Sequence, residues 1–446
     1  MTEDTVFALS SPVGGAIAII RITGSDAKAA LSRVFVSAGE KEPEHRRMSY
    51  GHVVDFETGE KIDSAMACFF KAPSTYTGED MAEIYIHGSR VIAKRTLSLL
   101  SRFLRPAEGG EFTKRAFMNG KMDLSRAEAV MDVINSVTER GARMAEEQLE
   151  GSIGDGIKEI ENKLLDILSG VEAAIDYPDE LEEDTVSSLQ SELLPITEKL
   201  DELIKGGNAA RIFRDGASVA ILGAPNAGKS SLFNALMGKE RAIVTDIPGT
   251  TRDTLEEAMD ICGAPVRITD TAGIRQGADE AERIGVERAK KAGDAADLVI
   301  IAIDGTKEPA GESLSLLDAA RNGEYRKFIL IFTKADKPGF AVLGSCGDLS
   351  PIAISSVTHL GLDALRERMA ELLLTKEAES ALVTNTRHIH ALEEAREDLL
   401  RADATLGTDL AAADIRSALY ALGRITGREV TADVIDRIFS RFCVGK

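Results

Sequence analysis

The sequence predicts a multidomain fold of α/β and α type, because three patterns follow one another along its 446 residues. Residues 1–117 combine short β-like runs with turns, and residues 118–213 repeat apolar side chains at helical spacing. Residues 214–375 alternate strongly apolar runs with helical or loop stretches, and helical spacing returns over residues 376–446. A usual domain length of about 150 residues leaves room for about three domains.

The first segment predicts a compact α+β domain. Four runs rich in Ile, Val, Phe and Tyr predict strands, at residues 16–23, 52–56, 65–70 and 82–88. A helical pattern follows at residues 90–104.

The second segment predicts helices, one of which ends before Pro178 because proline cannot continue the hydrogen-bond ladder. A further helix is predicted at about residues 185–205, with Gly206 and Gly207 as its stop. After residue 380 come the helical runs RHIHALEEAREDLLRAD, DIRSALYALGRITG and ADVIDRIFSRF. The simplest architecture inserts the third segment between two parts of one helical domain.

The third segment predicts an α/β domain with a mostly parallel sheet. Its apolar runs are nearly continuous, as in strands that are buried on both faces. These runs are SVAILG, RITDTAG, DLVIIAID, KFILIFTK and SPIAISS.

Composition excludes several classes of protein. No window of about 20 apolar residues predicts a membrane span, and the acidic N-terminus does not resemble a secretory signal. The four cysteines lie far apart, which argues against a structural zinc site or a disulfide framework and favours a reducing cytoplasm. A formal net charge of −20 argues against broad, nonspecific binding of nucleic acid, although it also simply aids solubility.

A phosphate-binding loop is predicted at GAPNAGKS, residues 223–230, between a strand-like and a helix-like run. Gly223 and Gly228 permit close approach of the backbone to phosphate oxygens. Lys229 provides a cation for the β and γ phosphates, and Ser230 a hydroxyl for Mg²⁺. The strand–loop–helix context disfavours the alternative of a glycine-rich turn with a chance lysine.

Two further segments fit the same nucleotide. DTAG at residues 270–273 ends a strand, so Asp270 is expected to hold Mg²⁺ through water, and Gly273 to donate its N–H to the γ-phosphate. TDIPGTTRD lies between the two motifs, and its Thr250 and Thr251 both qualify chemically as Mg²⁺ ligands.

TKAD at residues 333–336 predicts selection of guanine. Asp336 would accept hydrogen bonds from N1–H and the exocyclic amine of guanine, which adenine does not offer in that geometry. The stem of Lys334 would lie along the base, while Thr333 departs from the usual Asn. Ser355 and Ser356 follow a later strand and are candidates to give a backbone N–H to guanine, although a simple strand-end turn explains them nearly as well.

One expected group is absent. Ile274 stands where Ras-like enzymes carry the Gln that orients the attacking water, and no arginine finger is evident. Hydrolysis therefore needs its water-orienting group and its extra positive charge from elsewhere.

The whole chain resembles the MnmE (TrmE) family of tRNA modification GTPases. Beyond the nucleotide motifs, the resemblance rests on SSPVGGAIAIIRITG, STYTGEDMAEIYIHG, GEFTKRAFMNGKMDLSRAEA, VEAAIDYPDE and the terminal FCVGK. It implies an N-terminal tetrahydrofolate-binding and dimerisation domain at residues 1–117. It also implies a helical domain at residues 118–213 and 376–446, and a Ras-like P-loop GTPase domain at residues 214–375.

The same resemblance implies partners and a reaction. The family forms a homodimer that joins the FAD- and NADH-using protein MnmG (GidA) in a heterotetramer or larger complex. Together they add an aminomethyl or carboxymethylaminomethyl group to carbon 5 of the wobble uridine of certain tRNAs. The one-carbon unit comes from a folate, such as 5-formyl- or methylene-tetrahydrofolate.

The resemblance also assigns the missing hydrolytic groups. Asn226, with the backbone oxygens of Thr245, Ile247 and Thr250, would hold a potassium ion that supplies the positive charge. Thr251 matches the magnesium ligand. Glu282 matches the glutamate that orients water, although without the resemblance a solvated helix face is the simpler interpretation. The predicted GTP-binding set is Asn226, Ala227, Gly228, Lys229, Ser230, Ser231, Thr245, Thr251, Asp270, Thr271, Ala272, Gly273, Thr333, Lys334, Asp336, Ser355 and Ser356.

A folate site is implied at Arg21, Glu79, Lys121 and Lys446, where cations and a carboxylate suit a glutamate tail and a pterin ring. Each of these residues alone would be interpreted as a surface charge. Cys443 in the tail is a candidate for catalysis, beside Lys229 and Glu282, although a lone cysteine is usually a small buried hydrophobe. The local basic run Lys114, Arg115, Lys121 and Arg126 fits either RNA contact or an ordinary helix surface.

Two alternatives remain. A ribosome-assembly GTPase would share the nucleotide motifs, but a KH module in a basic context should then follow them. Acidic helices and FCVGK follow instead. A folate-dependent aminomethyl transferase with an idle nucleotide domain conflicts with the full set of hydrolytic motifs.

Overall fold

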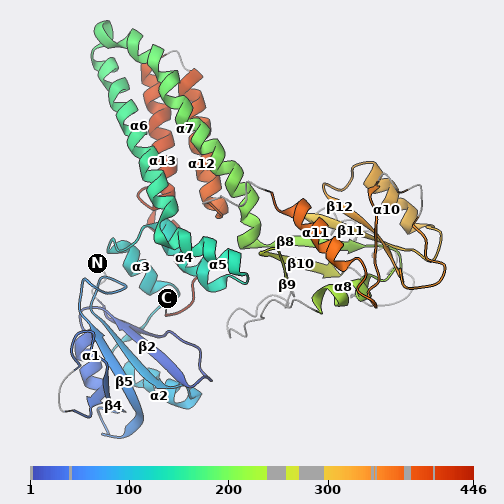
Figure 1. The fold of residues 1–446 in the computed structure, drawn as a ribbon. Helices are drawn as coiled ribbons and strands as arrows, with labels where there is room; N and C mark the ends of the chain where they lie inside the picture. Colours follow the sequence, from blue (N-terminus) through green and yellow to red (C-terminus); the bar gives the residue numbers. More distant parts are fainter. Residues whose placement is uncertain are drawn as a thin grey trace.

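The computed structural model describes residues 4–39, 43–238, 258–270, 296–342, 346, 349–375, 383–404 and 407–445, without the side chains of residues 178–187, 258, 269, 270 and 404. Figure 1 shows an N-terminal sheet, a long helical bundle and an α/β part. The fold is thus multidomain and of mixed α/β and α type, as the sequence predicted.

The N-terminal part is built on one twisted sheet in the order β3-β4-β5-β6-β2-β1-β7. Its neighbours are antiparallel except β1 with β7. The strands are β1 (Val6–Leu9), β2 (Ile17–Thr23), β3 (Phe35–Ser37), β4 (Ser49–Val54), β5 (Lys61–Phe70), β6 (Met81–His87) and β7 (Arg105–Pro106). The four predicted strands are present as β2, β4, β5 and β6.

Helices cover one face of this sheet. The helices α1 (Ala27–Val34) and α2 (Arg90–Leu100) join a core that includes Ile20, Ile22 and Ile84. Strand residues alternate between the two faces, so Ile17, Arg21 and the other odd positions of β2 point away from these helices. We call this side the outer face of the sheet.

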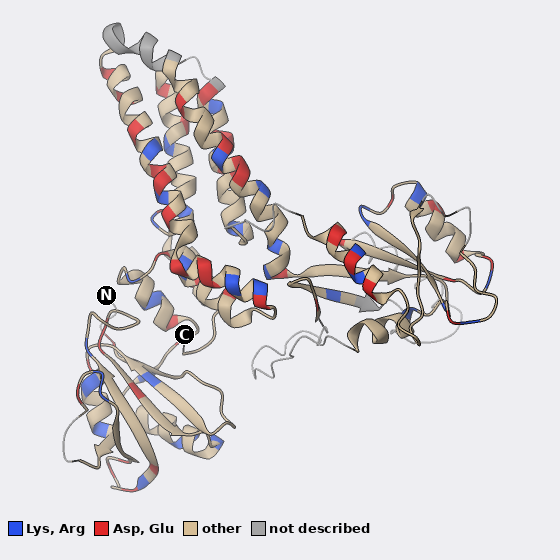
Figure 2. Cartoon of the chain, in the orientation of Figure 1, with Lys and Arg blue, Asp and Glu red and all other residues tan. Residues whose placement is uncertain are grey.

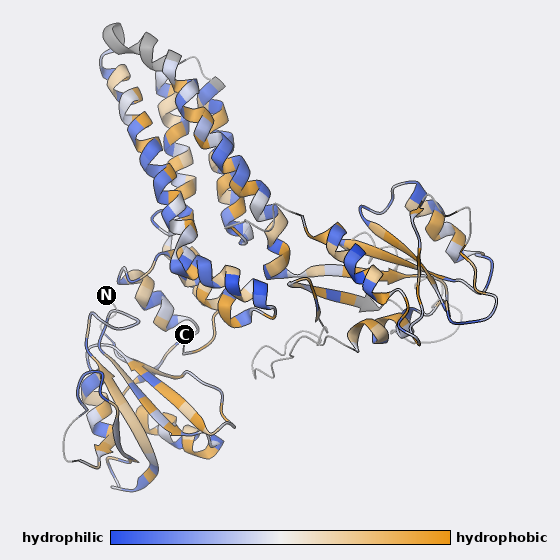
Figure 3. Ribbon diagram, in the orientation of Figure 1, coloured by the Kyte–Doolittle hydropathy of each residue, from blue (hydrophilic) through white to orange (hydrophobic). Residues whose placement is uncertain are grey.

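The helical part contains α3 (Glu111–Met118), α4 (Leu124–Asn135), α5 (Glu139–Glu150), α6 (Ser152–Asp176), α7 (Pro178–Asp215), α12 (Thr386–Ala404), α13 (Thr408–Thr426) and α14 (Ala432–Phe439). One apolar core joins α6 and α7 with α12 and α13, so helices from before and after the α/β part pack together. Figure 3 shows hydrophobic residues alternating with hydrophilic ones along these helices, as the buried stripe requires.

The predicted stop at Gly206 and Gly207 is wrong. The helix α7 begins with Pro178 and continues through both glycines to Asp215. Both glycines are buried, and a Cβ added to Gly207 would lie 3.0 Å from Cγ1 of Ile389 on α12. The glycines therefore allow α12 to approach α7 closely, and this packing outweighs their weak helix propensity.

The α/β part has a sheet in the order β13-β12-β11-β8-β10-β9, parallel except for β9. Its strands are β8 (Ala217–Leu222), β9 (Ala258–Ile261), β10 (Ala264–Asp270), β11 (Leu298–Asp304), β12 (Phe328–Thr333) and β13 (Ile352–Ala353). Separate cores on its two faces involve α8 (Lys229–Met237) and α11 (Leu362–Leu373) on one side and α10 (Glu312–Arg321) on the other. The predicted mostly parallel sheet is confirmed.

The charges of the helical part are mixed in sign. Figure 2 shows acidic and basic residues interspersed along α6 and the part of α7 that is coloured. Among the described residues, no helix combines the length and apolar character needed to cross a bilayer.

Candidate functional site: a nucleotide-binding edge and an N-terminal cavity

The phosphate-binding loop leaves the end of β8 and enters α8, whose N-cap is Gly228 with φ +90°. Gly223 has φ +158°, and a Cβ there would lie only 2.3 Å from the carbonyl oxygen of Ala302 on β11. Asn226 also has positive φ, which asparagine tolerates better than most residues. The loop thus keeps its backbone against β11, and its amides and the α8 N-terminus form an anion site.

Lys229 lies folded against this loop. Its Nζ donates to the carbonyl oxygens of Gly223 at 2.6 Å and Ala224 at 3.0 Å. Ser230 and Ser231 follow in the first turn of α8 and are exposed. The cation, the hydroxyls and the helix N-terminus therefore occupy one short stretch of backbone, as binding of a triphosphate requires.

Thr333 connects the base-selecting motif to the phosphate loop. Its buried hydroxyl donates to the carbonyl oxygen of Ala227 at 2.6 Å and lies 3.2 Å from that of Ile303. This contact accounts for threonine at a position where asparagine is usual: the hydroxyl ties the loop to the end of β12. No sequence pattern indicates this link between Thr333 and Ala227, because the two residues are 106 positions apart.

The base-selecting motif continues at Lys334 and Asp336. The ammonium of Lys334 pairs with Asp304 at 2.5 Å. Burial acts to raise the pKa of Asp304, but its hydrogen bonds from Lys334 and Thr306 outweigh burial and lower the pKa to about 2. The Asp304 carboxylate therefore stays ionised and fixes the lysine stem.

Asp336 is exposed and oriented by Ser355. The buried Ser355 hydroxyl donates to Oδ1 of Asp336 at 2.7 Å, and this bond lowers the pKa of Asp336. The backbone N–H of Ser355 donates to the carbonyl oxygen of Leu360, so its side chain is the group that faces the motif. A carboxylate held ionised in this way suits the acceptor role towards guanine, and contact of Ser355 or Ser356 with the base stays a prediction.

The donor set suits magnesium. Asp270 ends β10, which runs parallel to β8 with Asp270 opposite Ile221, so it lies at the edge from which the phosphate loop leaves. Asp270 and Ser230 are residue types whose oxygens Mg²⁺ prefers beside phosphates, and the backbone brings both to this edge. Several predicted residues lie outside the described ones: Thr245, Ile247, Thr250, Thr251, Thr271, Ala272, Gly273, Ile274 and Glu282. The potassium and water-orienting assignments therefore stay predictions.

The predicted folate residues lie at the N-terminal sheet. Nε of Arg21 pairs with Glu83 at 2.7 Å on the outer face. Glu79 accepts from Thr23 and from Arg115, each at 3.1 Å. The exposed Lys121 donates to the carbonyl oxygen of Pro73, and Lys446 lies outside the described residues.

Arg115 is not a surface charge. Its side chain is 4% exposed and pairs with Glu79, Glu111 and Asp4. The neighbouring Lys114 pairs with Asp436 of α14. The predicted basic run therefore does not form a continuous cationic surface, and Arg115 fits neither RNA contact nor an ordinary helix face.

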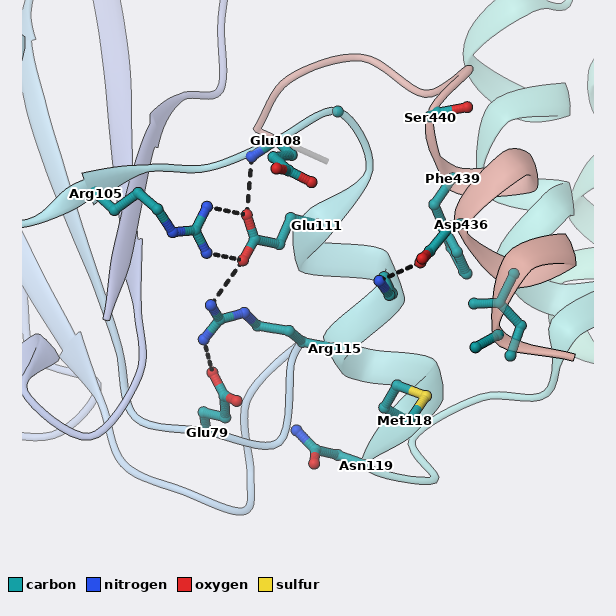
Figure 4. Close-up of a pocket in the computed structure, with 14 residues that line it drawn as sticks. Glu79, Arg105, Glu108, Glu111, Arg115, Met118, Asn119, Asp436, Phe439 and Ser440 are labelled. Carbon is teal, nitrogen blue, oxygen red and sulfur yellow. Dashed lines mark hydrogen bonds and ion pairs between the residues drawn. The ribbon is translucent and has the colours of Figure 1, made fainter. Parts of the chain in front are cut away.

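A cavity of about 750 Å³ lies between α3 and α14. Figure 4 shows its wall, a chain of charges from Arg105 through Glu111 and Arg115 to Glu79. The buried Nε of Arg115 has no hydrogen-bond partner among the described residues. Cations and carboxylates beside apolar Phe439 offer the chemistry that a charged heteroaromatic ligand such as folate would use.

The C-terminal tail packs on the N-terminal part. Val444 pairs with Gly109, and the N–H of Gly110 donates to the carbonyl oxygen of Cys443. Gly445 has φ +91°, and a Cβ there would lie 2.6 Å from the carbonyl oxygen of Leu9. Cys443 is exposed, so its interpretation as a buried hydrophobe is wrong, and a catalytic role stays a prediction.

Comparisons with solved structures gave only partial likenesses. The G domain of the T. maritima FeoB iron transporter shares 31% identity, covering 35% of this chain and 98% of that one, with a TM-score of 0.27. An Aquifex aeolicus Era variant bound to GDP and AlF4⁻ shares 26% identity, covering 41% and 67%, with a TM-score of 0.28.

Comparisons of sequence cover the whole chain. The family model of the MnmE helical domain matches residues 124–443, and that of the GTP-binding protein TrmE N-terminus matches residues 5–121. The tRNA modification GTPase MnmE of Alkaliphilus metalliredigens is 39% identical over 461 residues, covering 100% of this chain and 99% of the relative. That of Lactiplantibacillus plantarum is 39% identical over 459 residues, covering 99% and 98%. With its nucleotide-binding edge and this full-length identity, the chain belongs to the MnmE family of GTPases.

Proposed function

We propose that this chain hydrolyses GTP to GDP and phosphate as part of an enzyme that modifies the wobble uridine of certain tRNAs. The observation that carries the proposal is the guanine-type site, with Asp336 ionised and held by Ser355, in a chain that matches tRNA modification GTPases along its full length. A tRNA substrate would also place the protein in the cytoplasm.

In the proposed mechanism the residues of this chain mainly position GTP. Asp336 accepts from the guanine edge, and Lys229 exchanges its carbonyl partners for phosphate oxygens. Ser230 and Asp270 would hold a magnesium ion, which would supply positive charge beside the phosphates. Glu282 orients water for attack on the γ-phosphorus, and the bond from that phosphorus to the β–γ bridging oxygen breaks. A potassium ion at Asn226 would supply positive charge between the phosphates, where the transition state gains negative charge.

Potassium dependence gives the first prediction. With Ile274 in place of a water-orienting Gln, we expect GTP turnover to be faster in KCl than in NaCl at matched ionic strength, by about tenfold or more if the ion replaces an arginine finger. The Asn226→Ala variant should lose this difference while it still binds GDP. Equal turnover of the native chain in the two salts would refute the potassium assignment.

The N-terminal part supports two finer proposals, a homodimer and a folate site. The outer face of the sheet carries exposed apolar side chains, Ile17, Tyr50 and Met66, and Tyr50 lies directly opposite Met66 on the neighbouring strand. Such a face is typical of a contact surface between subunits. Arg21 lies on the same face, and the cavity that Glu79 lines lies beside the C-terminal tail.

The proposed reaction needs a second protein. We propose that an FAD- and NADH-using MnmG-type partner supplies the redox step, because the family resemblance implies that partner. A folate would supply the one-carbon unit at Arg21, Glu79, Lys121 and Lys446. The ribosome-assembly alternative predicts no change in tRNA nucleosides.

Mass spectrometry of tRNA nucleosides decides between these functions and gives the second prediction. Deleting the gene should remove the aminomethyl-type modification at uridine carbon 5, and the native gene should restore it. A gene that encodes the Lys229→Ala variant should not restore the modification, because the triphosphate then loses its main cation. A Glu172→Gln gene, altered at an exposed pair in the bundle, serves as the matched control. An unchanged nucleoside profile in the deletion strain would refute the assignment.

A further inference from the structure

Helix α4 contacts the chain at both places where it passes between the helical and the α/β parts. The chain enters the α/β part just after Arg214, near the end of α7, and Arg387 lies in the first turn of α12 after the chain returns. Arg214 pairs with Asp132 and Arg387 pairs with Glu128. These two carboxylates are four residues apart in sequence and so lie one turn apart on the same side of α4.

The pair at Arg387 is the firmer of the two. Its Nε and Nη2 donate to the two carboxylate oxygens of Glu128 at 2.9 and 2.6 Å, and its Nη1 donates to the carbonyl oxygen of Arg424 at 2.5 Å. The fully buried His388 adds a hydrogen bond of 2.7 Å to Glu128. A guanidinium fork on a buried carboxylate fixes orientation as well as distance.

The pair at Arg214 is less complete. Nε of Arg214 lies 2.8 Å from Oδ1 of Asp132, while the buried Oδ2 has no hydrogen-bond partner in the described part of the chain. The guanidinium can therefore shift from one oxygen to the other without losing the ion pair. The ion pair of Arg387 with Glu128 is thus fixed, whereas that of Arg214 with Asp132 can adjust.

The helix next to α4 also contacts the α/β part. On α5, the guanidinium of Arg140 lies 4.2 Å from the ring centroid of Phe213 at the end of α7. A Cβ added to Gly263, in the β9–β10 turn, would lie 2.8 Å from Cβ of Arg140. Movement of the α/β part relative to the bundle must therefore disturb α5 and α4.

The segment that precedes α4 contacts the N-terminal part. In Figure 1, α4 and α5 lie at the base of the bundle, between the N-terminal sheet and the α/β part. The segment that joins α3 to α4 contacts the 73–79 loop through two hydrogen bonds. The side-chain amide of Asn119 donates to the carbonyl oxygen of Thr77 at 2.8 Å, and Nζ of Lys121 donates to the carbonyl oxygen of Pro73 at 3.0 Å. This loop ends at Glu79, which Arg115 of α3 contacts.

We propose that α4 transmits nucleotide-dependent movement of the α/β part to the 73–79 loop, with Asp132 and Glu128 as the positioning residues that couple it to Arg214 and Arg387. The proposal rests on the proposed function, because it assumes that GTP and GDP favour different positions of the α/β part. It assigns the coupling to α4, which carries the two carboxylates, and to the segment before it, whose Asn119 and Lys121 contact the backbone of the 73–79 loop.

Hydrogen exchange measured by mass spectrometry tests the proposal on the full chain. Amide exchange is followed in peptides covering residues 73–79 and 119–123, with GDP and then with a non-hydrolysable GTP analogue, in KCl. The native chain should differ between the two nucleotides by about fivefold or more in exchange rate at both segments, the size of a modest coupling. GTP turnover is measured separately, with GTP, on the same protein preparations.

Four variants make the test specific. Asp132→Asn weakens the adjustable pair, and Arg387→Lys keeps the charge but loses the fork; each should remove most of the nucleotide-dependent difference. Asp132→Glu should retain it, since a carboxylate remains. Glu172→Gln, which disturbs the Glu172–Arg416 pair within the bundle, should behave like the native chain. Melting temperatures from circular dichroism identify any variant that has lost its fold. If either Asp132→Asn or Arg387→Lys fails to fold, the other one tests the proposal.

The outcomes are separable. If folded Asp132→Asn and Arg387→Lys variants keep the full difference, or if the native chain turns over GTP without any difference at these segments, the proposal is overturned. If the native chain neither binds nor hydrolyses GTP, the proposed function itself fails.

Discussion

A single hydroxyl illustrates what sequence motifs leave out. The residue types of the phosphate loop and of Asp336 were predictable, because binding a triphosphate and guanine restricts them chemically. The role of Thr333 was not, because its acceptor, the carbonyl oxygen of Ala227, lies far away in the sequence. The prediction of RNA contact or an ordinary helix surface at Arg115 fails for a similar reason, since its burial depends on Glu79, Glu111 and Asp4 from separate segments.

The Thr333 contact gives the third prediction. Thr333→Val keeps the shape but leaves the Ala227 carbonyl without its donor, which costs about 1–3 kcal/mol. We expect weaker GDP binding, by about tenfold, and a lower melting temperature, with the preference for guanine over adenine retained. Titration with a fluorescent GDP analogue measures the change, and Thr333→Ser is the control that should bind normally. If the valine variant bound GDP as tightly as the native chain, the Thr333 hydroxyl would not stabilise the phosphate-binding loop against β12.

At the scale of elements, local sequence patterns predicted most strands correctly, but they failed where tertiary packing outweighs local propensity. Most strands of both sheets were identified from their apolar runs, because a buried strand must carry apolar residues whatever its neighbours are. The Gly206–Gly207 pair was interpreted as a helix stop, since glycine is a weak helix former in isolation. Only the approach of Ile389 on α12 explains why α7 keeps glycine there.

The connection of α4 to α12 gives the fourth prediction. Burial acts to raise the pKa of Glu128, but its bonds to His388 and Arg387 outweigh burial and lower the pKa from 4.5 to about 2. A carboxyl with a lowered pKa in the folded state stabilises the fold above the unfolded value, and this contribution is lost as pH falls through the folded value.

The Glu128→Gln variant should therefore be less stable than the native chain at neutral pH, and the difference should shrink as pH falls from about 4.5 towards 2. Urea unfolding followed by circular dichroism at a series of pH values measures it. The exposed Glu172→Gln variant should change little. A difference that stays constant across this range would show that the fold does not lower the pKa of Glu128.

At the scale of the whole molecule, the sequence predicted that the α/β part is inserted between two parts of one helical domain, but not which helices of the two parts pack together. That pairing emerges only from the structure, where α6 and α7 pack with α12 and α13. Helical periodicity shows which face of a helix is apolar, and it does not show which partner covers that face.

The outer face of the N-terminal sheet gives the fifth prediction. Tyr50 and Met66 are 58% and 43% exposed, so Tyr50→Asp should place a charge in the proposed subunit contact and shift the protein from dimer towards monomer. Light scattering after size-exclusion chromatography measures the mass. Val91→Asp, at a 68% exposed apolar position on α2 of the opposite layer, is the matched control and should leave the dimer intact. A dimeric Tyr50→Asp variant would place the contact elsewhere.

The shared core of the bundle has a consequence during synthesis on the ribosome. Ile157, Leu164 and Leu200 emerge early, whereas Leu392, Ile415 and other residues that cover them emerge only after the entire nucleotide-binding part has been translated. For that interval the nascent α6 and α7 present uncovered apolar stripes, the kind of surface that chaperones bind. Translation speed through the inserted part should therefore influence how much of the newly made protein escapes aggregation.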